Sequence, residues 1–412
     1  MHTPPSLILD LFAGPGGWSE GIRTHLSLTD IGIEWDAAAC QTRAAAQHTT
    51  IRADVAAYPT RHLAKLTHSL IVGLIASPPC TLFSSAGKGI GRLVLDVLAD
   101  GIRRLFRGDD CRTEIRERIL PVALAEQKKA NARRPTAKQW TAEKVLAAAQ
   151  GDAYCATLVL EPARYLHDLT ADGDPLEWVA LEQVPSVEPL WQVYAAELRV
   201  LGWSVWAGVL NAADYGVPQT RERAVLIGSR VRQVRPPEPT HSHLGDVHDL
   251  FGGYRAAWVT MADALDLPAE LTVNTRGARR TSGGNDFSTG IPSWALTEKI
   301  RSWWILRQGA RSNATRRRLD EPAGTTVAGH SRRDYQWLLV GDGAQERRAF
   351  TIPEAARLQS FPEAYPWTGS ESRQFLQIAN AVPPLLAAHI VSAATGLPML
   401  NAAALQSVGA AA

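Results

Sequence analysis

Short apolar runs alternate with amphipathic stretches along the chain up to about residue 230. A period near 3.6 residues predicts helices at Trp18–Leu28 and Leu190–Leu201. Strands are predicted at Ser6–Asp10, Ile31–Trp35, Leu70–Ala76, Glu177–Leu181, Trp203–Leu210 and Ala224–Gly228. Leu70–Ala76 is apolar on both faces, as a strand inside a parallel sheet must be. This order of elements predicts an α/β fold with a Rossmann-like, doubly wound sheet.

Two stretches interrupt the alternation. Residues from about 87 to 150 have one apolar helix face and carry 14 Lys and Arg against 8 Asp and Glu, which indicates a basic helical insertion. Residues from about 230 to 345 are rich in Arg, Gly, Trp and Thr and show weak periodicity. We therefore expect residues 1–229 and 373–401 to form the sheet domain, and residues 230–372 to form a smaller, irregular domain.

Composition narrows the class of protein without identifying an activity. The 412 residues are 45% hydrophobic and 20% charged, which is typical of folded globular proteins, and a net charge of +2 is too small to indicate nucleic-acid binding by itself. Cys40, Cys80, Cys111 and Cys155 are widely spaced and form no CxxC pair, so no metal site or redox disulfide is predicted. Because no apolar run is long enough to span a membrane and Met1–Ser6 lacks a signal-peptide pattern, we expect a cytoplasmic protein.

A glycine-rich turn, Phe12–Gly17, follows the first predicted strand. Glycines are needed where the backbone bends sharply and approaches a ligand. Ser19 occupies the position of the third glycine of the dinucleotide fingerprint GxGxxG, so the turn does not match that motif. The turn suits either a nucleoside ligand without pyrophosphate, such as S-adenosylmethionine, or an ordinary connection from strand to helix.

Three residues beyond the turn favour the nucleoside interpretation. Glu34 ends the second strand about twenty residues after Gly14, where an acid can hydrogen-bond both ribose hydroxyls. Trp35 offers a flat face for a purine, and Asp54, after the expected third strand, can reach an adenine amino group. The alternative is a sheet of the same kind with an ordinary surface glutamate at position 34.

Cys80 follows two prolines at the end of the buried strand Leu70–Ala76. Pro78 and Pro79 fix the backbone direction, and ligands of such sheets bind at the carboxyl ends of the strands. A thiol at this place can act as a nucleophile once it is ionised, whereas a structural cysteine more often lies inside an apolar run.

Five sequence blocks occur in the order seen in the cytosine-5 DNA methyltransferase family, which this chain resembles. They span nearly the whole chain: Asp10–Gly17, Ser77–Cys80, Pro218–Arg223, Glu354–Pro362 and Ala379–Pro384. The resemblance implies the fold of S-adenosylmethionine-dependent methyltransferases and an enzyme that methylates carbon 5 of cytosine in double-stranded DNA. Its target base would be flipped out of the duplex, and the 230–372 domain would recognise the site.

The same resemblance implies four catalytic residues. Cys80 would attack carbon 6 of the cytosine, which makes carbon 5 nucleophilic, and Glu182 would protonate N3. Arg223 would contact the ring oxygen, while Arg221 would support the site. A surface glutamate and ordinary salt-bridging arginines are the alternatives. Gln183 stands where the family usually has Asn, but its longer amide can still brace the Cys80 loop.

Binding residues are implied in the same way. Contacts with S-adenosylmethionine are expected from Phe12, Gly14, Gly16, Gly17, Glu34, Trp35, Asp54, Pro79, Leu158 and Asn380. Contacts with DNA are expected from Ser84, Ser85, Gln219, Arg276 and Arg316. Separately, Thr351 and Glu354 form a capping box around Pro353, which predicts a helix through Leu358.

Three other functions share parts of these patterns. A methyltransferase acting on adenine N6 or cytosine N4 needs no nucleophilic thiol, so Cys80 argues against it, and a non-catalytic DNA-binding relative should lack Cys80 or Glu182. A tRNA cytosine-5 methyltransferase of the DNA-enzyme type shares nearly every block, and the large basic second domain favours duplex DNA. We expect a monomeric enzyme of a bacterial host or phage, either alone or beside a restriction endonuclease.

Overall fold

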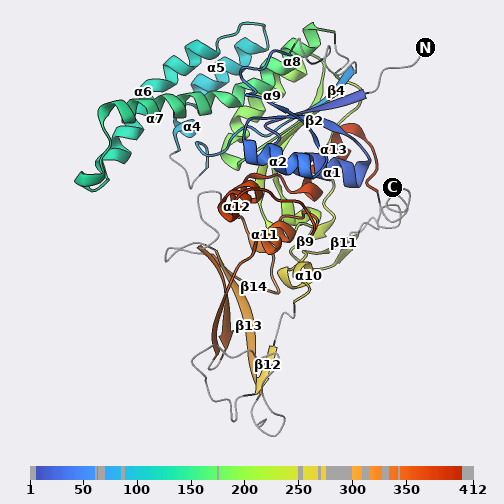
Figure 1. Ribbon diagram of the computed structural model, residues 1–412. Coiled ribbons are helices and arrows are strands. Elements are labelled where there is room, and N and C mark those ends of the chain that lie inside the picture. Colours follow the sequence, from blue (N-terminus) through green and yellow to red (C-terminus); the bar gives the residue numbers. More distant parts are fainter. Residues whose placement is uncertain are drawn as a thin grey trace. The chain divides into compact units, whose positions relative to one another are not determined.

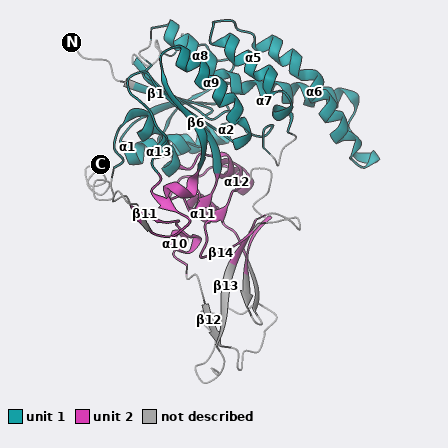
Figure 2. Ribbon diagram, turned by 180° about the vertical axis from the view of Figure 1, so that it is seen from behind, with its two compact units in different colours: residues 1–210, 222–238, 384–412 teal, residues 211–221, 239–383 magenta. Residues whose placement is uncertain are grey.

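A computed structural model divides the chain into two compact units. It describes residues 6–60, 63, 70–84, 89–173, 176–248, 254–267, 271–274, 299–308, 315–326, 334–341 and 344–400. Residues 1–210, 222–238 and 384–412 are called the sheet unit here, and residues 211–221 and 239–383 the β-rich unit (Figure 2). The β-rich unit thus takes in two segments, 211–221 and 373–383, which the sequence pattern assigns to the sheet domain.

A seven-stranded sheet forms the centre of the sheet unit, with the strand order β3-β2-β1-β4-β5-β8-β6 (Figure 1). The strands are β1 (Ser6–Leu11), β2 (Asp30–Glu34), β3 (Thr49–Arg52), β4 (Leu70–Ala76), β5 (Trp178–Gln183), β6 (Ser204–Asn211) and β8 (Glu222–Ser229). Strands β1 to β5 pair in parallel, whereas β8 runs antiparallel to β5. The α/β class and the doubly wound sheet predicted from the sequence are confirmed.

Helices cover both faces of this sheet. Helices α1 and α2 follow β1 and β2 on one face together with α13, while α5, α8 and α9 lie on the other face (Figure 1). The α-helices are α1 (Gly17–Leu26), α2 (Ala37–Ala45), α4 (Ile90–Leu93), α5 (Leu95–Leu105), α6 (Arg112–Ala132), α7 (Ala142–Thr157), α8 (Glu161–Ala171), α9 (Glu188–Val200) and α13 (Pro384–Thr395). Short 3-10 turns are η2 (Thr136–Lys138), η3 (Leu158–Leu160) and η4 (Pro185–Val187).

The charged stretch after Cys80 contributes both to the core and to the surface. Leu98, Ile102 and Leu105 of α5 are buried in the main hydrophobic core, as the helical period of the sequence predicts. The next two helices, α6 and α7, pack against each other as a helical hairpin (Figure 1). Helix α5 therefore packs into the main core, and α6 and α7 also bury apolar residues there.

Helix α13 packs directly on α1, and a glycine makes this approach possible. A Cβ atom on Gly21 would lie 2.1 Å from the carbonyl oxygen of Pro384, so no other residue fits without a shift of the backbone. By composition alone the stretch Glu371–Thr395, with hydropathy 1.4, is apolar enough to cross a membrane. The most apolar 18 residues of this stretch are 72% buried inside the structure, which is typical of core helices.

The β-rich unit contains more regular structure than its weak periodicity predicts. Its largest sheet has the order β12-β13-β16-β17 with β14 also paired to β13, and all of these pairs are antiparallel. The strands of the unit are β7 (Gln219–Thr220), β9 (His241–Ser242), β10 (Val247–His248), β11 (Tyr254–Ala257), β12 (Leu271–Asn274), β13 (Lys299–Gln308), β14 (Thr315–Arg318), β15 (Ala323–Gly324), β16 (Tyr335–Gly341) and β17 (Ala344–Ala349). The predicted smaller second domain is confirmed, and it is built of small sheets whose strands arise from long-range pairing rather than from local pattern.

The short helices of this unit are defined by their caps. They are α10 (Met261–Leu265), α11 (Ile352–Leu358), α12 (Glu371–Asn380) and the 3-10 turn η5 (Ala212–Tyr215). The predicted capping box is confirmed, since the Glu354 amide donates to the Thr351 hydroxyl at 3.3 Å and the Thr351 amide donates to the Glu354 carboxylate at 2.8 Å.

Candidate active site

Four neighbouring strands of the sheet unit end at the same level. Their pairing places Ile33 of β2 beside Leu11 of β1, Leu11 beside Ala76 of β4, and Ala76 beside Leu181 of β5. The residues that follow are therefore brought to one edge of the sheet, which we call the carboxyl edge. Ligands of doubly wound sheets bind at this edge.

The glycine turn at the carboxyl edge has a backbone that favours glycine. Phe12, Gly14 and Gly16 have φ angles of 59°, 53° and 104°, and Gly16 is the N-terminal cap of α1. Phe12 is held in this uncommon conformation between β1 and the turn, which is a pattern often found at ligand sites. The backbone of the turn can therefore be approached closely by a ligand, directly before helix α1 begins at Gly17.

Glu34 ties the end of β2 to this turn and is not an ordinary surface residue. Its Oε2 accepts the Gly14 amide at 2.8 Å, and its Oε1 accepts the Trp35 and Asp36 amides at 2.8 and 2.7 Å. Burial raises the pKa of Glu34, while the three amides oppose that shift. A carboxylate accepts about four hydrogen bonds, so these three leave room for a ligand hydroxyl. Beside it, the Trp35 side chain is 72% exposed.

Asp54 follows β3 and is held by two donors from different parts of the chain. Its Oδ1 accepts the Ala56 amide at 2.9 Å, and its Oδ2 accepts the hydroxyl of Tyr154 on α7. Burial is the main cause that raises the pKa of Tyr154, followed by the bond to Asp54. Tyr154 is not among the residues predicted from the sequence. The signal that could have found it is its spacing: it lies four residues before Leu158, a predicted cofactor contact, and residues four apart lie near one face of a helix.

The Asp54 side chain borders a polar cavity of about 440 Å³ in the sheet unit. The cavity lies between the segment after β3, the start of α6 and the end of α7. Its lining residues are Asp54, Ala56, Ala57, Asp110, Arg112, Thr113, Arg116 and Tyr154.

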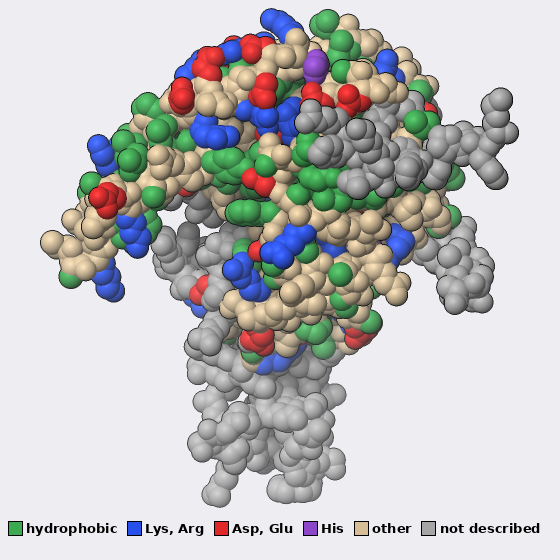
Figure 3. Space-filling view, turned by 45° about the horizontal axis from the view of Figure 1, so that its top comes forward, with side chains coloured by type: hydrophobic (Ala, Val, Ile, Leu, Met, Phe, Trp, Pro, Cys, Tyr) green, Lys and Arg blue, Asp and Glu red, His purple; other side chains and the backbone are tan. Residues whose placement is uncertain are grey.

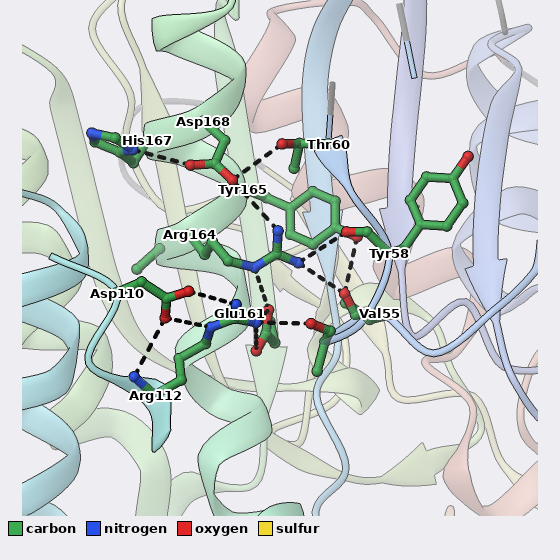
Figure 4. Close-up of polar contacts among 12 residues, drawn as sticks. Val55, Tyr58, Thr60, Asp110, Arg112, Glu161, Arg164, Tyr165, His167 and Asp168 are labelled. Carbon is green, nitrogen blue, oxygen red and sulfur yellow. Dashed lines mark hydrogen bonds and ion pairs between the residues drawn. The ribbon is translucent and has the colours of Figure 1, made fainter. Parts of the chain in front are cut away.

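Buried ion pairs hold the segment after β3 in place (Figure 4). Arg112 donates to the Ala56 carbonyl at 2.8 Å and to Glu161 at 3.0 Å. Arg164 donates to the other oxygen of Glu161 at 2.7 Å and to the Val55 carbonyl at 2.9 Å. Helices α6 and α8 thereby satisfy backbone carbonyls beside Asp54 and orient this part of the carboxyl edge.

The loop that carries Cys80 is braced on both sides. Trp18 donates to the Ser77 hydroxyl at 2.9 Å, and Gln183 donates to the Pro78 carbonyl at 2.6 Å. The longer Gln183 side chain therefore makes the bracing contact that the sequence predicts. The Cys80 carbonyl accepts the amides of residues 83 and 84 at 3.0 Å each, and the Cys80 thiol is half-buried at the rim of the hydrophobic core.

Glu182 and Arg223 form a buried ion pair at the carboxyl edge. Arg223 Nε lies 2.8 Å from Glu182 Oε1, and Glu182 is only 5% exposed. The antiparallel pairing of β5 with β8 explains the contact. Glu182 lies opposite Val225, so Arg223, two residues before Val225 on β8, is the diagonal neighbour of Glu182. Within the described part of the chain, Glu182 Oε2 makes no hydrogen bond. The surface-glutamate alternative is excluded.

Arg221 and Gln219 are both buried in the β-rich unit. Arg221, for which a supporting role is predicted, is 1% exposed and donates to the carbonyls of Ala379 and Ala381 at 3.0 Å each, so it braces that part of the β-rich unit. Gln219 is fully buried and donates to the Gln359 side chain at 2.8 Å. A buried amide with this partner has no access to DNA. The sequence could not show this, because burial here depends on residues more than 100 positions away.

The remaining predicted residues fall into three groups. Leu158 is buried at the start of η3, while Pro79 and Ser84 are half-buried in the Cys80 loop. Asn380 is exposed at the end of α12, and Arg316 is exposed on β14. Ser85 and Arg276 lie outside the described residues. Among the residues that the structure describes, no group of three or more His, Cys, Asp or Glu could hold a metal ion.

The family model of the C-5 cytosine-specific DNA methylases matches residues 7–103 and 177–395. The chain belongs to this family. Membership makes it a DNA cytosine-5 methyltransferase. The matched residues include the strands of the main sheet and most of the β-rich unit.

Two curated relatives show how the likeness is distributed. The Type II methyltransferase M1.HphI of Haemophilus parahaemolyticus is 25% identical over 395 residues, which cover 93% of this chain and 85% of the relative. The Type II methyltransferase M.AgeI of Thalassovita gelatinovora is 48% identical over a match that covers 46% of this chain and 66% of the relative. A solved structure, a putative DNA modification methyltransferase encoded within an E. coli prophage, aligns over 95% of this chain and 99% of its own with 19% identity and a TM-score of 0.48.

Residues 104–176 of this methylase lie outside the family match. The sequence pattern places the insertion at 87–150, but the match includes α4 and most of α5. The unmatched part begins at the end of α5 and comprises α6, α7 and α8. It supplies Tyr154, Arg112 and Arg164, which reach the carboxyl edge.

Proposed function

We propose that this methylase transfers a methyl group from S-adenosylmethionine to carbon 5 of a flipped cytosine in a specific DNA site, through a covalent adduct with Cys80. The observation that carries the proposal is the arrangement at the carboxyl edge. A braced loop with a half-buried thiol follows β4, and the neighbouring strand β5 carries Glu182 near its end, paired with Arg223 of β8. Methylation of cytosine carbon 5 requires a nucleophile and an acid at one place.

Cys80 supplies the nucleophile in this scheme. Its thiolate forms a bond to carbon 6 of the cytosine, and the electron pair of the C5–C6 double bond moves into the ring, which makes carbon 5 nucleophilic. After carbon 5 has received the methyl group, its proton passes to solvent, and the electron pair of that C–H bond re-forms the C5–C6 double bond as the thiolate leaves carbon 6. The braces from Trp18 and Gln183 keep the loop in place during this cycle.

Glu182 and Arg223 compensate the charge that builds on the ring. As the thiolate adds, N3 becomes more basic and takes a proton from Glu182. Arg223 holds Oε1 of that carboxyl group and leaves Oε2 for the base. In this scheme its guanidinium also contacts the ring oxygen, where negative charge develops. When the adduct collapses, the proton returns to Glu182.

The other end of the carboxyl edge suits S-adenosylmethionine, which supplies an electrophilic methyl group on a sulfonium. The positive-φ turn at Gly14 and Gly16 allows close approach of the backbone, and Glu34 retains capacity for a ribose hydroxyl. Trp35 exposes its ring for the purine, and Asp54 presents a fixed acceptor for the amino group. We place the cofactor against these residues.

Substitution of Trp35 by Ala is expected to weaken binding of S-adenosylhomocysteine about tenfold, measured by calorimetry. Loss of one aromatic face for a stacked base costs roughly 1–3 kcal/mol. Tyr254→Ala, which removes an exposed aromatic ring from the β-rich unit, is the matched control and should bind as the wild type does. Equal affinity of the Trp35→Ala and wild-type proteins would contradict the placement of the purine.

The β-rich unit is proposed to recognise the target sequence. Residues 230–345 hold arginines of the type that contacts phosphates and guanine, and Arg316 on β14 is exposed. Because both curated relatives above are Type II methyltransferases, we propose a modification enzyme, alone or beside a cognate endonuclease, that acts as a monomer on DNA in the cytoplasm of a bacterium or its phage.

The direct test is expression of the enzyme in a bacterial host without cytosine methylation, followed by bisulfite sequencing of host DNA and tRNA. We expect protected cytosines in one short DNA sequence context and unprotected tRNA. Protection confined to tRNA would contradict the proposed substrate, and protection of neither would contradict the proposed activity.

A further inference from the structure

Helices α6 and α7 form an arm that projects from the rest of the sheet unit (Figures 1 and 2). Helix α6 has 21 residues and is therefore about 32 Å long. Residues 126–144, which we call the arm tip, comprise the end of α6, the connection and the start of α7, and residues 132–139 are all exposed. The arm tip lies in the segment outside the family match.

At the base of the arm, Arg104, Arg112 and Arg118 pair with acidic neighbours. The ion pairs are Arg104–Asp109, Arg104–Glu114, Arg112–Asp110, Arg112–Glu161 and Arg118–Asp100, with distances of 2.5 to 3.0 Å. These residues stabilise the arm and present little net charge.

The arm tip differs sharply in its charge. Its basic residues are Lys128, Lys129, Arg133, Arg134, Lys138 and Lys144, and its acidic residues are Glu126 and Glu143. Lys129 pairs with Glu126 at 2.6 Å. The other five cations make no ion pair with any residue that the structure describes. Figure 3 shows separate Lys and Arg side chains along the arm.

The arm tip is also held in a defined conformation. The Asn131 side chain donates to the Trp140 carbonyl at 3.1 Å and accepts the Trp140 amide at 2.8 Å. The Arg134 guanidinium lies 4.1 Å from the centre of the Trp140 ring, and Lys144 Nζ lies 4.8 Å from it. Fixed cations lose less conformational entropy when they bind an anion than freely moving ones do.

We propose that the arm tip binds phosphates of the DNA substrate outside the target site. A group of unneutralised cations, two of which are held against the Trp140 ring, is complementary to a polyanion, and DNA is the substrate class of this family. A protein partner is less suitable, because interface cores need large apolar anchors and Trp140, half-buried, is the one such side chain in the arm tip. This inference rests on DNA as the substrate and adds a binding surface to the proposed function.

The test compares two double variants in fluorescence anisotropy with a duplex of about 40 base pairs. Arg133→Gln with Arg134→Gln removes two cations of the arm tip. Arg103→Gln with Arg107→Gln removes two exposed cations of α5 and the segment after it, as a matched control. Each lost phosphate contact lowers the slope of log Kd against log salt by about 0.9, so we expect a decrease of about 1.8 for the arm-tip variant. The ratio of its Kd to that of the wild type then falls about twelvefold between about 50 and 200 mM salt.

The control variant should keep the wild-type slope. Wild-type slope and Kd in the arm-tip variant would overturn the inference, as would an equal decrease in both variants, which would reveal a general effect of net charge. Calorimetry with S-adenosylhomocysteine checks that each variant retains a folded sheet unit. A wild-type protein that methylates no DNA would instead contradict the proposed function, so the two failures can be told apart.

Discussion

Replacement of Cys80 by Ala is expected to lower the rate of methyl transfer to DNA by at least about 10⁴-fold, since loss of a catalytic nucleophile has effects of this size or larger. Without the thiolate, carbon 5 of cytosine stays a poor nucleophile. Cys80 contributes little to the glycine turn or to Trp35, so binding of S-adenosylhomocysteine should stay close to that of the wild type. Single-turnover transfer of a labelled methyl group measures the first quantity, and calorimetry the second.

A matched control is Cys155→Ala. Cys155 is also a half-buried free cysteine, and burial is the main cause that raises the pKa of its thiol, so it is poorly suited to act as a nucleophile. This variant should retain activity. DNA with 5-fluorocytosine at the target gives a second readout, because fluorine cannot leave as a proton does and the adduct persists. The wild type and Cys155→Ala should form a gel-stable adduct, and Cys80→Ala should form none. Normal methylation by Cys80→Ala would refute the covalent route.

Substitution of Glu182 by Gln should lower kcat by about 10²- to 10³-fold, the usual contribution of a positioned acid. Gln retains an oxygen that can accept from Arg223 Nε, so the pairing geometry survives while the transferable proton is lost. The rate of transfer under saturating DNA and cofactor is the measurement. Urea unfolding should show a modest loss of stability, which distinguishes an effect on chemistry from unfolding.

Glu177→Gln is the control on the same chain segment. Glu177 is exposed directly before β5, whereas Glu182 lies buried near the end of that strand. The control should therefore methylate DNA at the wild-type rate. If Glu182→Gln kept more than about a tenth of the wild-type rate, another group would have to supply the proton to N3.

The likeness between the predicted and observed sheet has a local cause. Leu70–Ala76 is a continuous apolar run, and α1 and α9 repeat their apolar positions at the helical period. The glycine turn, the Pro78–Pro79 pair and the Thr351–Glu354 capping box are also local signals. Each of these signals fixes the backbone only within a few residues of itself, so a single sequence is sufficient to predict the local structure.

Tertiary contacts determine the burial and the partners of several candidate residues. Arg221 and Arg223 look alike in sequence, yet Arg221 is buried against the 379–381 backbone and Arg223 pairs with Glu182. Asp54 meets Tyr154 across 100 positions, and strands β12 to β17 arise where periodicity is weak. A side chain's partner depends on which distant segment packs beside it, which the local pattern does not record.

The sequence by itself thus determined most strands of the main sheet, helices α1 and α9, the turn at Gly14–Gly17 and the placement of Cys80 after a buried strand. These follow from backbone preferences and hydrophobic periodicity, which act over short distances along the chain. Only the tertiary structure decided that β8 runs antiparallel to β5 and so brings Arg223 to Glu182, and that the arm carries unpaired charge at its tip and paired charge at its base. Strand pairing and ion pairing join residues far apart in the sequence, so they are settled only when the chain has packed.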